Sequence, residues 1–81
     1  MTLKEEIENL IRPEIEREGY EFKKVELKFQ GRRLALEITI DKKGGLSVED
    51  CAKVSRLIEP VLDKSDLIKQ KYFLIVSSPG I

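Results

Sequence analysis

The fold of this chain is decided by its last stretch, Tyr72-Phe73-Leu74-Ile75-Val76-Ser77-Ser78-Pro79-Gly80. The first five of these residues are apolar, and aromatic and β-branched side chains of this kind favour a β-strand. Side chains alternate along a strand, so the even-numbered residues share one side of a sheet while Phe73 and Ile75 share the other. A domain of 81 residues covers one side of its sheet easily. The partner of the second side is therefore the functional question.

Two further strands are expected upstream, joined as a hairpin. Apolar and polar residues alternate over 25–29, which is typical of a half-exposed strand. Tyr20 and Phe22 are out of phase with that pattern, so they either precede the strand or flank a bulge. Residues 30–32, Gln-Gly-Arg, predict a tight turn, and apolar side chains at every second position over 34–40 predict the partner strand.

A helix is expected before the hairpin. Thr2 with Glu5 three positions later is a capping-box pattern, and apolar residues then recur on one helical stripe as far as Ile15. Pro13 lies inside this pattern and predicts a kink or a restart of the helix, because proline lacks the N–H that the preceding turn needs. Gly19 is typical of the position that closes a helix.

A second helix is expected over 48–62, where Ser47 and Asp50 resemble another N-terminal cap. Apolar and small side chains cover more than half of its circumference, namely Val48, Cys51, Ala52, Val54, Ser55, Leu57, Ile58, Val61 and Leu62. So wide an arc predicts contacts with both the sheet and the first helix. Pro60 falls in the last turn and is expected to loosen the end of the helix.

The expected order is helix, strand, strand, helix, strand. We therefore expect residues 1–81 to form a single α+β domain, a two-layer sandwich in which two helices pack on one face of a small mixed three-stranded sheet.

Charge and composition narrow the function classes. Fifteen basic and fifteen acidic residues cancel, which argues against a generally basic nucleic-acid binder. The charges are uneven, with three basic and six acidic residues over 1–18 but seven basic and four acidic over 19–43. There is no histidine, and Cys51 is the single cysteine, so a disulfide framework, a zinc site and the usual general base are not expected. We expect a cytoplasmic protein with no membrane span, cofactor, metal or small-molecule substrate, and an enzyme is the least expected class.

Three stretches together resemble one protein family. They are Gly19-Tyr20-Glu21-Phe22, the run from Asp41 to Arg56 that ends in Asp50-Cys51-Ala52-Lys53-Val54-Ser55-Arg56, and the terminal run with Val76-Ser77-Ser78-Pro79-Gly80. The pattern is similar to that of the N-terminal domain of the RimP family of ribosome maturation factors. The likeness extends over nearly the whole chain.

The resemblance implies a non-catalytic, cytoplasmic assembly factor for the small ribosomal subunit. Family members bind the immature subunit near its ribosomal RNA and the twelfth small-subunit protein, and promote a late step of maturation. Their N-terminal domain is distantly similar to KH-type RNA-binding folds, and a β-barrel domain follows it. This chain ends at Ile81, so the second domain of the parent chain is expected to be absent from it. Lys24 and Ile75 stand where the family often carries an acid, so polar contacts there are expected to differ.

Two basic groups are candidates for RNA binding. Lys42-Lys43-Gly44-Gly45 precedes a helix, and turned backbone N–H groups, a helix N-terminus and two lysines suit a phosphate. The alternative is an ordinary glycine turn with solvated lysines. The second group lies on the predicted hairpin and suits RNA phosphates; it comprises Arg32, Arg33, Lys23, Lys24 and Lys28. The alternative there is a solvated hairpin whose lysines protect a sheet edge.

The last strand supplies candidates for docking a protein or the second domain. They are Phe73 and Ile75, with Ser77, Ser78, Pro79 and Gly80 after them. The alternative is a pair of scattered surface hydrophobes, which are common. Cys51 lies on the apolar arc of its helix, so we expect a buried structural thiol. The two serines have no evident base partner and are typical of a strand that enters a turn.

We therefore expect a domain that binds the immature 30S subunit through ribosomal RNA, a ribosomal protein or both. One alternative is a generic KH-like RNA-binding module, which comparable, salt-dependent binding to unrelated RNAs would favour. Another is an interaction or dimerisation domain that pairs through the uncovered face of its sheet.

Overall fold

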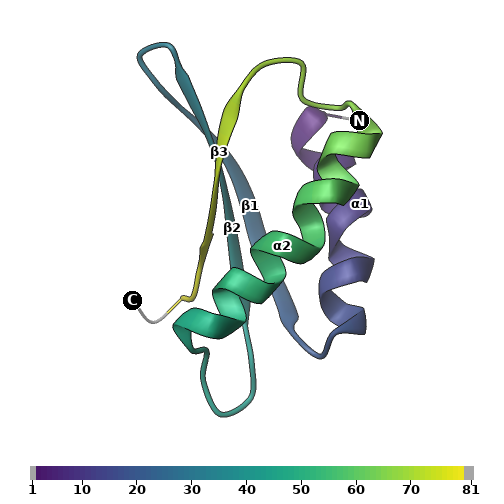
Figure 1. Ribbon diagram of the computed structural model, residues 1–81, viewed down its shortest axis with the longest axis vertical. Coiled ribbons are helices and arrows are strands. Elements are labelled where there is room, and N and C mark those ends of the chain that lie inside the picture. Colours follow the sequence, from purple (N-terminus) through teal and green to yellow (C-terminus); the bar gives the residue numbers. More distant parts are fainter. Residues whose placement is uncertain (1, 80–81) are drawn as a thin grey trace.

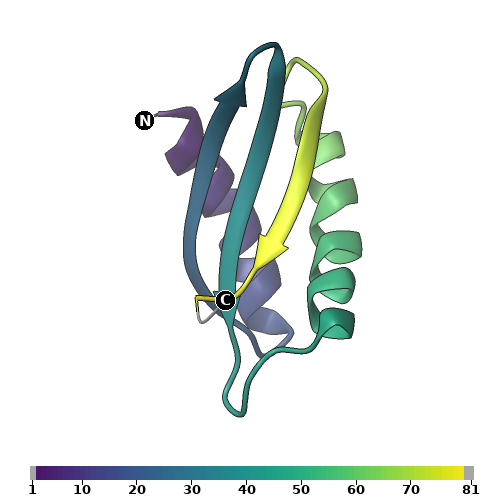
Figure 2. The same ribbon diagram turned by 90° about the vertical axis from the view of Figure 1, so that its left-hand side faces the viewer.

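The computed structural model describes residues 2–79, which form two layers (Figure 1). The elements follow the order α1 (Leu3–Arg17), β1 (Glu21–Gln30), β2 (Arg33–Asp41), α2 (Val48–Ser65) and β3 (Tyr72–Ser77). Both helices lie on one side of a three-stranded sheet, and Figure 2 shows the opposite side with all three strands in front. The expected fold class, α-β-β-α-β with two helices on a mixed sheet, is confirmed.

The sheet has the strand order β1-β2-β3, with β2 in the centre. β1 and β2 pair antiparallel as a hairpin, whereas β2 and β3 pair parallel. Leu36 of β2 lies opposite both Leu27 of β1 and Leu74 of β3. This register places the alternating apolar side chains of the three strands in one layer beneath the helices. We call that side of the sheet the inner face and the opposite side the outer face.

A bulge in β1 explains the phase change in its sequence. The register with β2 shifts between Phe22 and Lys24, so Lys23 is the extra residue. The shift allows Phe22 and Val25, three positions apart, both to be buried. Of the two arrangements expected for the residues before Val25, the bulge is the one that the structure contains.

The core lies between the helices and the inner face. Each helix contributes one stripe of fully or almost fully buried residues at every fourth position, Ile7, Ile11 and Ile15 from α1 and Val54, Ile58 and Leu62 from α2. The sheet contributes Phe22, Val25, Leu36, Ile38 and Ile40, and Tyr20 packs with them. Partly buried Leu10 of α1 and Leu57 of α2 pack against the same core beside these stripes, as the helical period predicts.

The apolar arc predicted for α2 is confirmed for seven of its nine residues, which are buried or half-buried, and α2 contacts both α1 and β3 as expected. The two exceptions lie in its first two turns. Val48 is 87% exposed, and Ala52 is also exposed. In these turns Asp50, rather than Val48 or Ala52, faces the domain and bonds Tyr20. Cys51 is half-buried as a free thiol rather than fully buried.

Neither internal proline ends its helix. α1 continues through Pro13 to Arg17, so the predicted restart does not occur, and α2 extends past Pro60 to Ser65 rather than ending at residue 62. Both prolines are exposed, as are Asn9 and Arg56 four positions before them. Water can therefore bond the carbonyl groups that each proline leaves without an N–H partner.

Gly19 closes α1 as expected. Its φ of +91° lies in the region that glycine adopts readily. Its N–H donates to the Glu16 carbonyl at 3.0 Å, and the N–H of Tyr20 donates to the Ile15 carbonyl at 3.3 Å. This pair of bonds is a Schellman motif, and it turns the chain directly into β1.

Candidate nucleic-acid and protein interfaces

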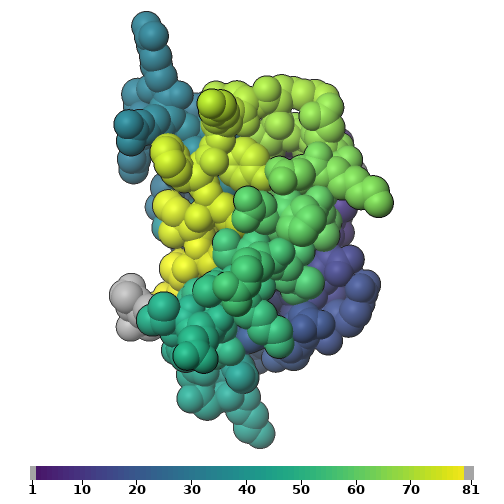
Figure 3. Space-filling view, viewed as in Figure 1, coloured from purple at the N-terminus to yellow at the C-terminus, as the bar shows by residue number. Residues whose placement is uncertain are grey.

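The hairpin turn carries the first candidate cations. Gln30, the last residue of β1, pairs with Arg33, the first residue of β2, so Gly31 and Arg32 form the turn. Arg32 and Arg33 are exposed, and the hairpin projects beyond its neighbours at the upper left of Figure 3. The guanidinium of Arg33 lies 5.6 Å from the centre of the Phe73 ring, a distance suited to a cation–π contact. The turn therefore presents Arg32 to solvent and holds Arg33 against β3.

The glycine loop lies at the other end of β2. The N–H of Gly45 donates to the carbonyl of Lys42 at 2.9 Å, and Gly44 has a φ of +92°. A bond between the first and fourth residues with glycine in this conformation at the third is typical of a type II turn. Lys43 is thus at the exposed second position of the turn. The backbone of this loop is therefore a glycine turn.

A hydrogen-bonded cluster anchors this loop to both helices. The hydroxyl of Tyr20 donates to Oδ1 of Asp50 at 2.8 Å, and the backbone N–H of Ser47 donates to Oδ2 at 3.0 Å. The Ser47 and Tyr20 bonds lower the pKa of Asp50 to about 2. Lys42 lies 3.5 Å from Oδ1 and 5.7 Å from the centre of the Tyr20 ring. Asp50 therefore holds Lys42 in place, whereas Lys43 is exposed and takes part in no salt bridge within residues 2–79.

The sequence indicated only part of this cluster. The Ser47 and Asp50 spacing predicts the cap, which is confirmed as a complete capping box. The bond from Tyr20 joins residues thirty positions apart, and nothing in either local pattern signals it.

All three lysines of the hairpin are paired with carboxylates. Lys23 lies 3.0 Å from Glu21, Lys24 lies 2.8 Å from Glu26, and Lys28 lies 3.1 Å from Glu37. The bonded carboxylates raise the pKa of Lys23 and of Lys24. Three members of the two candidate groups take part in no salt bridge within residues 2–79, namely Arg32, Arg33 and Lys43. Of these, Arg33 lies over the Phe73 ring.

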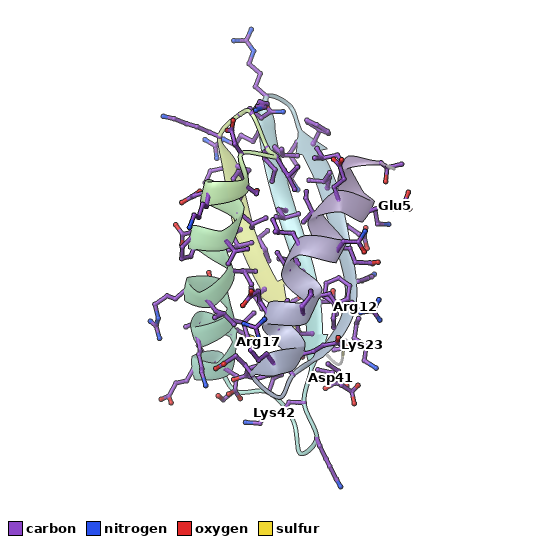
Figure 4. The ribbon with its side chains drawn as sticks, turned by 90° about the vertical axis from the view of Figure 1, so that its right-hand side faces the viewer. Glu5, Arg12, Arg17, Lys23, Asp41 and Lys42 are labelled. Carbon is purple, nitrogen blue, oxygen red and sulfur yellow. The ribbon has the colours of Figure 1, made fainter. Side chains whose placement is uncertain are left out.

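The structure does not bring the candidate cations together. Lys23 and Lys24 lie at the start of β1, beside the end of β2 at Asp41, and Figure 4 shows Lys23, Asp41 and Lys42 at the lower end of the molecule. The hairpin turn is at the upper end. β2 spans nine residues, so the two ends lie about 26 Å apart at the usual rise per residue. All five candidate cations lie on the hairpin as expected, but they are divided between its two ends.

The centre of the outer face carries two carboxylates, each paired with a lysine. Glu26 of β1 and Glu37 of β2 lie directly opposite each other, and Ile75 of β3 lies beside Glu37. Like charges in this position repel each other, and the flanking Lys24 and Lys28 each compensate one carboxylate. A phosphate backbone laid across this centre would meet two carboxylates. The outer face is better suited to a protein than to nucleic acid along its middle.

The β3 side of the outer face is apolar. Phe73 is 55% exposed and Ile75 is 42% exposed, whereas Ala35 and Thr39 on the neighbouring β2 are buried. The following residues, Ser77, Ser78 and Pro79, line a depression of about 670 Å³ together with Lys23 and Lys24. Gly80, the last of the predicted docking residues, lies outside the described residues.

Among the described residues, no group of three or more histidine, cysteine, aspartate and glutamate side chains is placed to hold a metal ion. Neither α1 nor α2 is long and apolar enough to cross a bilayer.

Comparison with models of known protein families matches residues 10–81 to the RimP N-terminal domain. The matched segment includes the hairpin, the glycine loop and β3, so it covers every candidate residue described above. The resemblance inferred from the three sequence stretches is confirmed.

Proposed function

The chain belongs to the RimP family of non-catalytic ribosome maturation factors, and from this premise we propose that it binds the immature small ribosomal subunit in the cytoplasm. The family match over residues 10–81 is the observation that carries the proposal. We assign the contacts with ribosomal RNA and with a ribosomal protein to separate surfaces, because the unpaired cations Arg32 and Lys43 lie apart from the exposed apolar Ile75.

Ribosomal RNA contacts the two ends of the molecule in this proposal. Arg32 at the hairpin turn and Lys43 at the glycine loop are exposed, and their charges are not compensated by a salt bridge within residues 2–79. Cations of this kind attract phosphates and release counterions when they bind. Between the ends, Lys24 and Lys28 are paired with Glu26 and Glu37, so the centre of the outer face attracts RNA less than the ends do.

A ribosomal protein or the second domain of the parent chain covers the β3 side of the outer face. Phe73 and Ile75 are adjacent on that face and exposed. The serines and Pro79 that follow line the neighbouring depression. An apolar area with a polar rim is typical of protein docking surfaces.

The mechanism is selective affinity for an immature conformation of the subunit. A factor that binds one conformation more tightly shifts the population toward it, by no more than the difference between its affinities for the two states. Two RNA contacts on opposite ends suit this role, because both form together only when the RNA segments are correctly spaced.

Co-sedimentation tests the proposal. The chain is mixed with immature and with mature small subunits, and the bound fraction is measured at increasing protein concentration. Preferential binding to immature subunits is expected. Equal affinity for both kinds of subunit, or no binding to either, contradicts the proposal.

Dimerisation through the outer face is the second candidate, and the exposed Phe73 and Ile75 favour it. Sedimentation equilibrium of the chain alone distinguishes it. Association that rises with concentration and is lost in Ile75→Lys supports a dimer, whereas a monomer at all concentrations supports docking of a different partner.

A further inference from the structure

Phe29 is an aromatic residue of the hairpin that the helices leave uncovered. It follows Val25 and Leu27 at every second position of β1, so it lies on the inner side of the sheet. Leu27 packs against the core, whereas Phe29 is 67% exposed and does not belong to the core cluster. The hairpin turn extends away from both helices (Figure 1), so the sheet continues past them at this position. Phe29 therefore presents its ring to solvent.

Phe73 is the other exposed ring near the hairpin turn, and its surroundings differ. The guanidinium of Arg33 lies 5.6 Å from the centre of the Phe73 ring, so a cation already occupies one face of that ring. Among the described residues, no cation lies over the ring of Phe29. An aromatic ring with an accessible face is the kind of surface on which an unpaired nucleic-acid base stacks.

The charge around Phe29 on the hairpin favours a polyanion. Residues 27–36 include three basic and no acidic residues, and Arg32 in the turn is exposed and in no salt bridge within residues 2–79. Phe29 precedes the last pair of the hairpin, Gln30 with Arg33, so its backbone lies about 7 Å from the turn. A base on the Phe29 ring and a phosphate on Arg32 can therefore belong to one short RNA segment.

We propose that Phe29 stacks on an unpaired RNA base whose neighbouring phosphate binds Arg32. This inference rests on the RNA contact proposed above for the hairpin end, and it adds that the RNA there is single-stranded. Arg32 alone does not distinguish single strands from duplexes, because both present phosphates. Phe29 does distinguish them, because the bases of a duplex stack on each other and only unpaired bases are available to an aromatic side chain.

The test compares two RNA oligomers of equal length at one salt concentration. One is oligoadenylate, and the other is an abasic oligomer, which has the same phosphates but no bases. Phe29→Leu keeps an apolar side chain and removes the ring, so it is expected to weaken oligoadenylate binding about tenfold and to leave abasic binding unchanged. Arg32→Ala is expected to weaken binding of both oligomers. The control Val48→Ala, at an exposed apolar position on α2, is expected to change neither.

A second measurement observes stacking directly. The chain has no tryptophan, so Phe29→Trp introduces a single indole at the site and retains an aromatic ring. Oligoadenylate is expected to bind this variant at least as tightly as the natural chain and to quench its tryptophan fluorescence. The abasic oligomer is expected to bind without quenching, and equal quenching by the two oligomers would contradict stacking.

The outcomes separate this inference from the proposed function. Equal effects of Phe29→Leu on the two oligomers would overturn stacking but leave the RNA contact at Arg32 in place. Weaker co-sedimentation of Phe29→Leu with immature subunits, at unchanged affinity for oligoadenylate, would also overturn stacking and would assign Phe29 to a pocket on a ribosomal protein. Failure of both oligomers to bind would overturn it too, and co-sedimentation of the natural chain then decides the proposed function by itself.

Discussion

The hydroxyl of Tyr20 donates a 2.8 Å hydrogen bond to Asp50, which joins the end of α1 to the first turn of α2. Tyr20 is 5% exposed and packs in the core. Asp50 also caps α2 through Ser47 and lies 3.5 Å from Lys42. One carboxylate therefore fixes the relative positions of two helices and the glycine loop that we propose to contact RNA.

The first prediction concerns the Tyr20 hydroxyl. Tyr20→Phe keeps the ring in the core but removes the donor to Asp50, so we expect the free energy of unfolding to fall by about 1 kcal/mol. Urea denaturation measures this change. Tyr72→Phe is the matched control, since the Tyr72 hydroxyl makes no side-chain hydrogen bond among the described residues. If Tyr72→Phe lowered the free energy of unfolding as much as Tyr20→Phe, the stabilising role of the Tyr20–Asp50 bond would be contradicted.

The second prediction concerns acid. The pKa of Asp50 is lowered from 3.8 to about 2 by the Ser47 and Tyr20 bonds, so the unfolded state binds a proton more readily than the folded state between these values. The stabilisation from this carboxylate is therefore complete above about pH 5 and is lost as the pH falls toward 2. Urea midpoints between about pH 5 and pH 2.5 should fall more steeply for the natural chain than for Asp50→Asn. Parallel curves for the two proteins would exclude this role of Asp50.

The third prediction concerns α2, where the sequence and the structure disagree. Ile58 is fully buried, and Val48 is 87% exposed, although both belong to the predicted apolar arc. Ile58→Ala is expected to lower the free energy of unfolding by about 2–5 kcal/mol, and Val48→Ala by no more than about 0.5 kcal/mol. Thermal or urea denaturation measures both. Similar losses for the two variants would mean that the N-terminal turn of α2 packs against the domain.

Local patterns predicted most of this fold because they act over a few residues. The strand alternation over 34–40, the two caps and Gly19 each depend on neighbours within one helical turn or one strand. The width of the α2 stripe depends on how α2 sits against α1 and β3, which no local pattern contains. No local pattern contains the distance between Lys23 and Arg32 either, because this distance follows from the length of the hairpin strands and not from the order of the charges. Ion pairs such as Lys28 with Glu37 also depend on the register of two strands.

The fourth prediction concerns the outer face. Ile75→Lys places a charge on a side chain that is 42% exposed, so we expect the domain to fold with a loss of at most about 1 kcal/mol. Co-sedimentation with immature small subunits should nevertheless fall markedly, because the apolar docking area is interrupted. Val48→Lys adds the same charge at an exposed position on α2 and should leave binding unchanged. Equal loss of binding in both variants would point to net charge rather than to docking at Ile75.

The fifth prediction concerns the two ends that we propose to contact RNA. The logarithm of the binding constant for immature subunits should fall linearly with the logarithm of salt concentration, because each phosphate contact releases counterions. Arg32→Ala and Lys43→Ala should each weaken binding and reduce the magnitude of that slope by about 1. Lys24→Ala removes an equal charge, but Lys24 is paired with Glu26 at 2.8 Å, so its slope should remain that of the natural chain. A larger change for Lys24→Ala than for Arg32→Ala and Lys43→Ala would move the RNA contact from the ends of the molecule to the outer face.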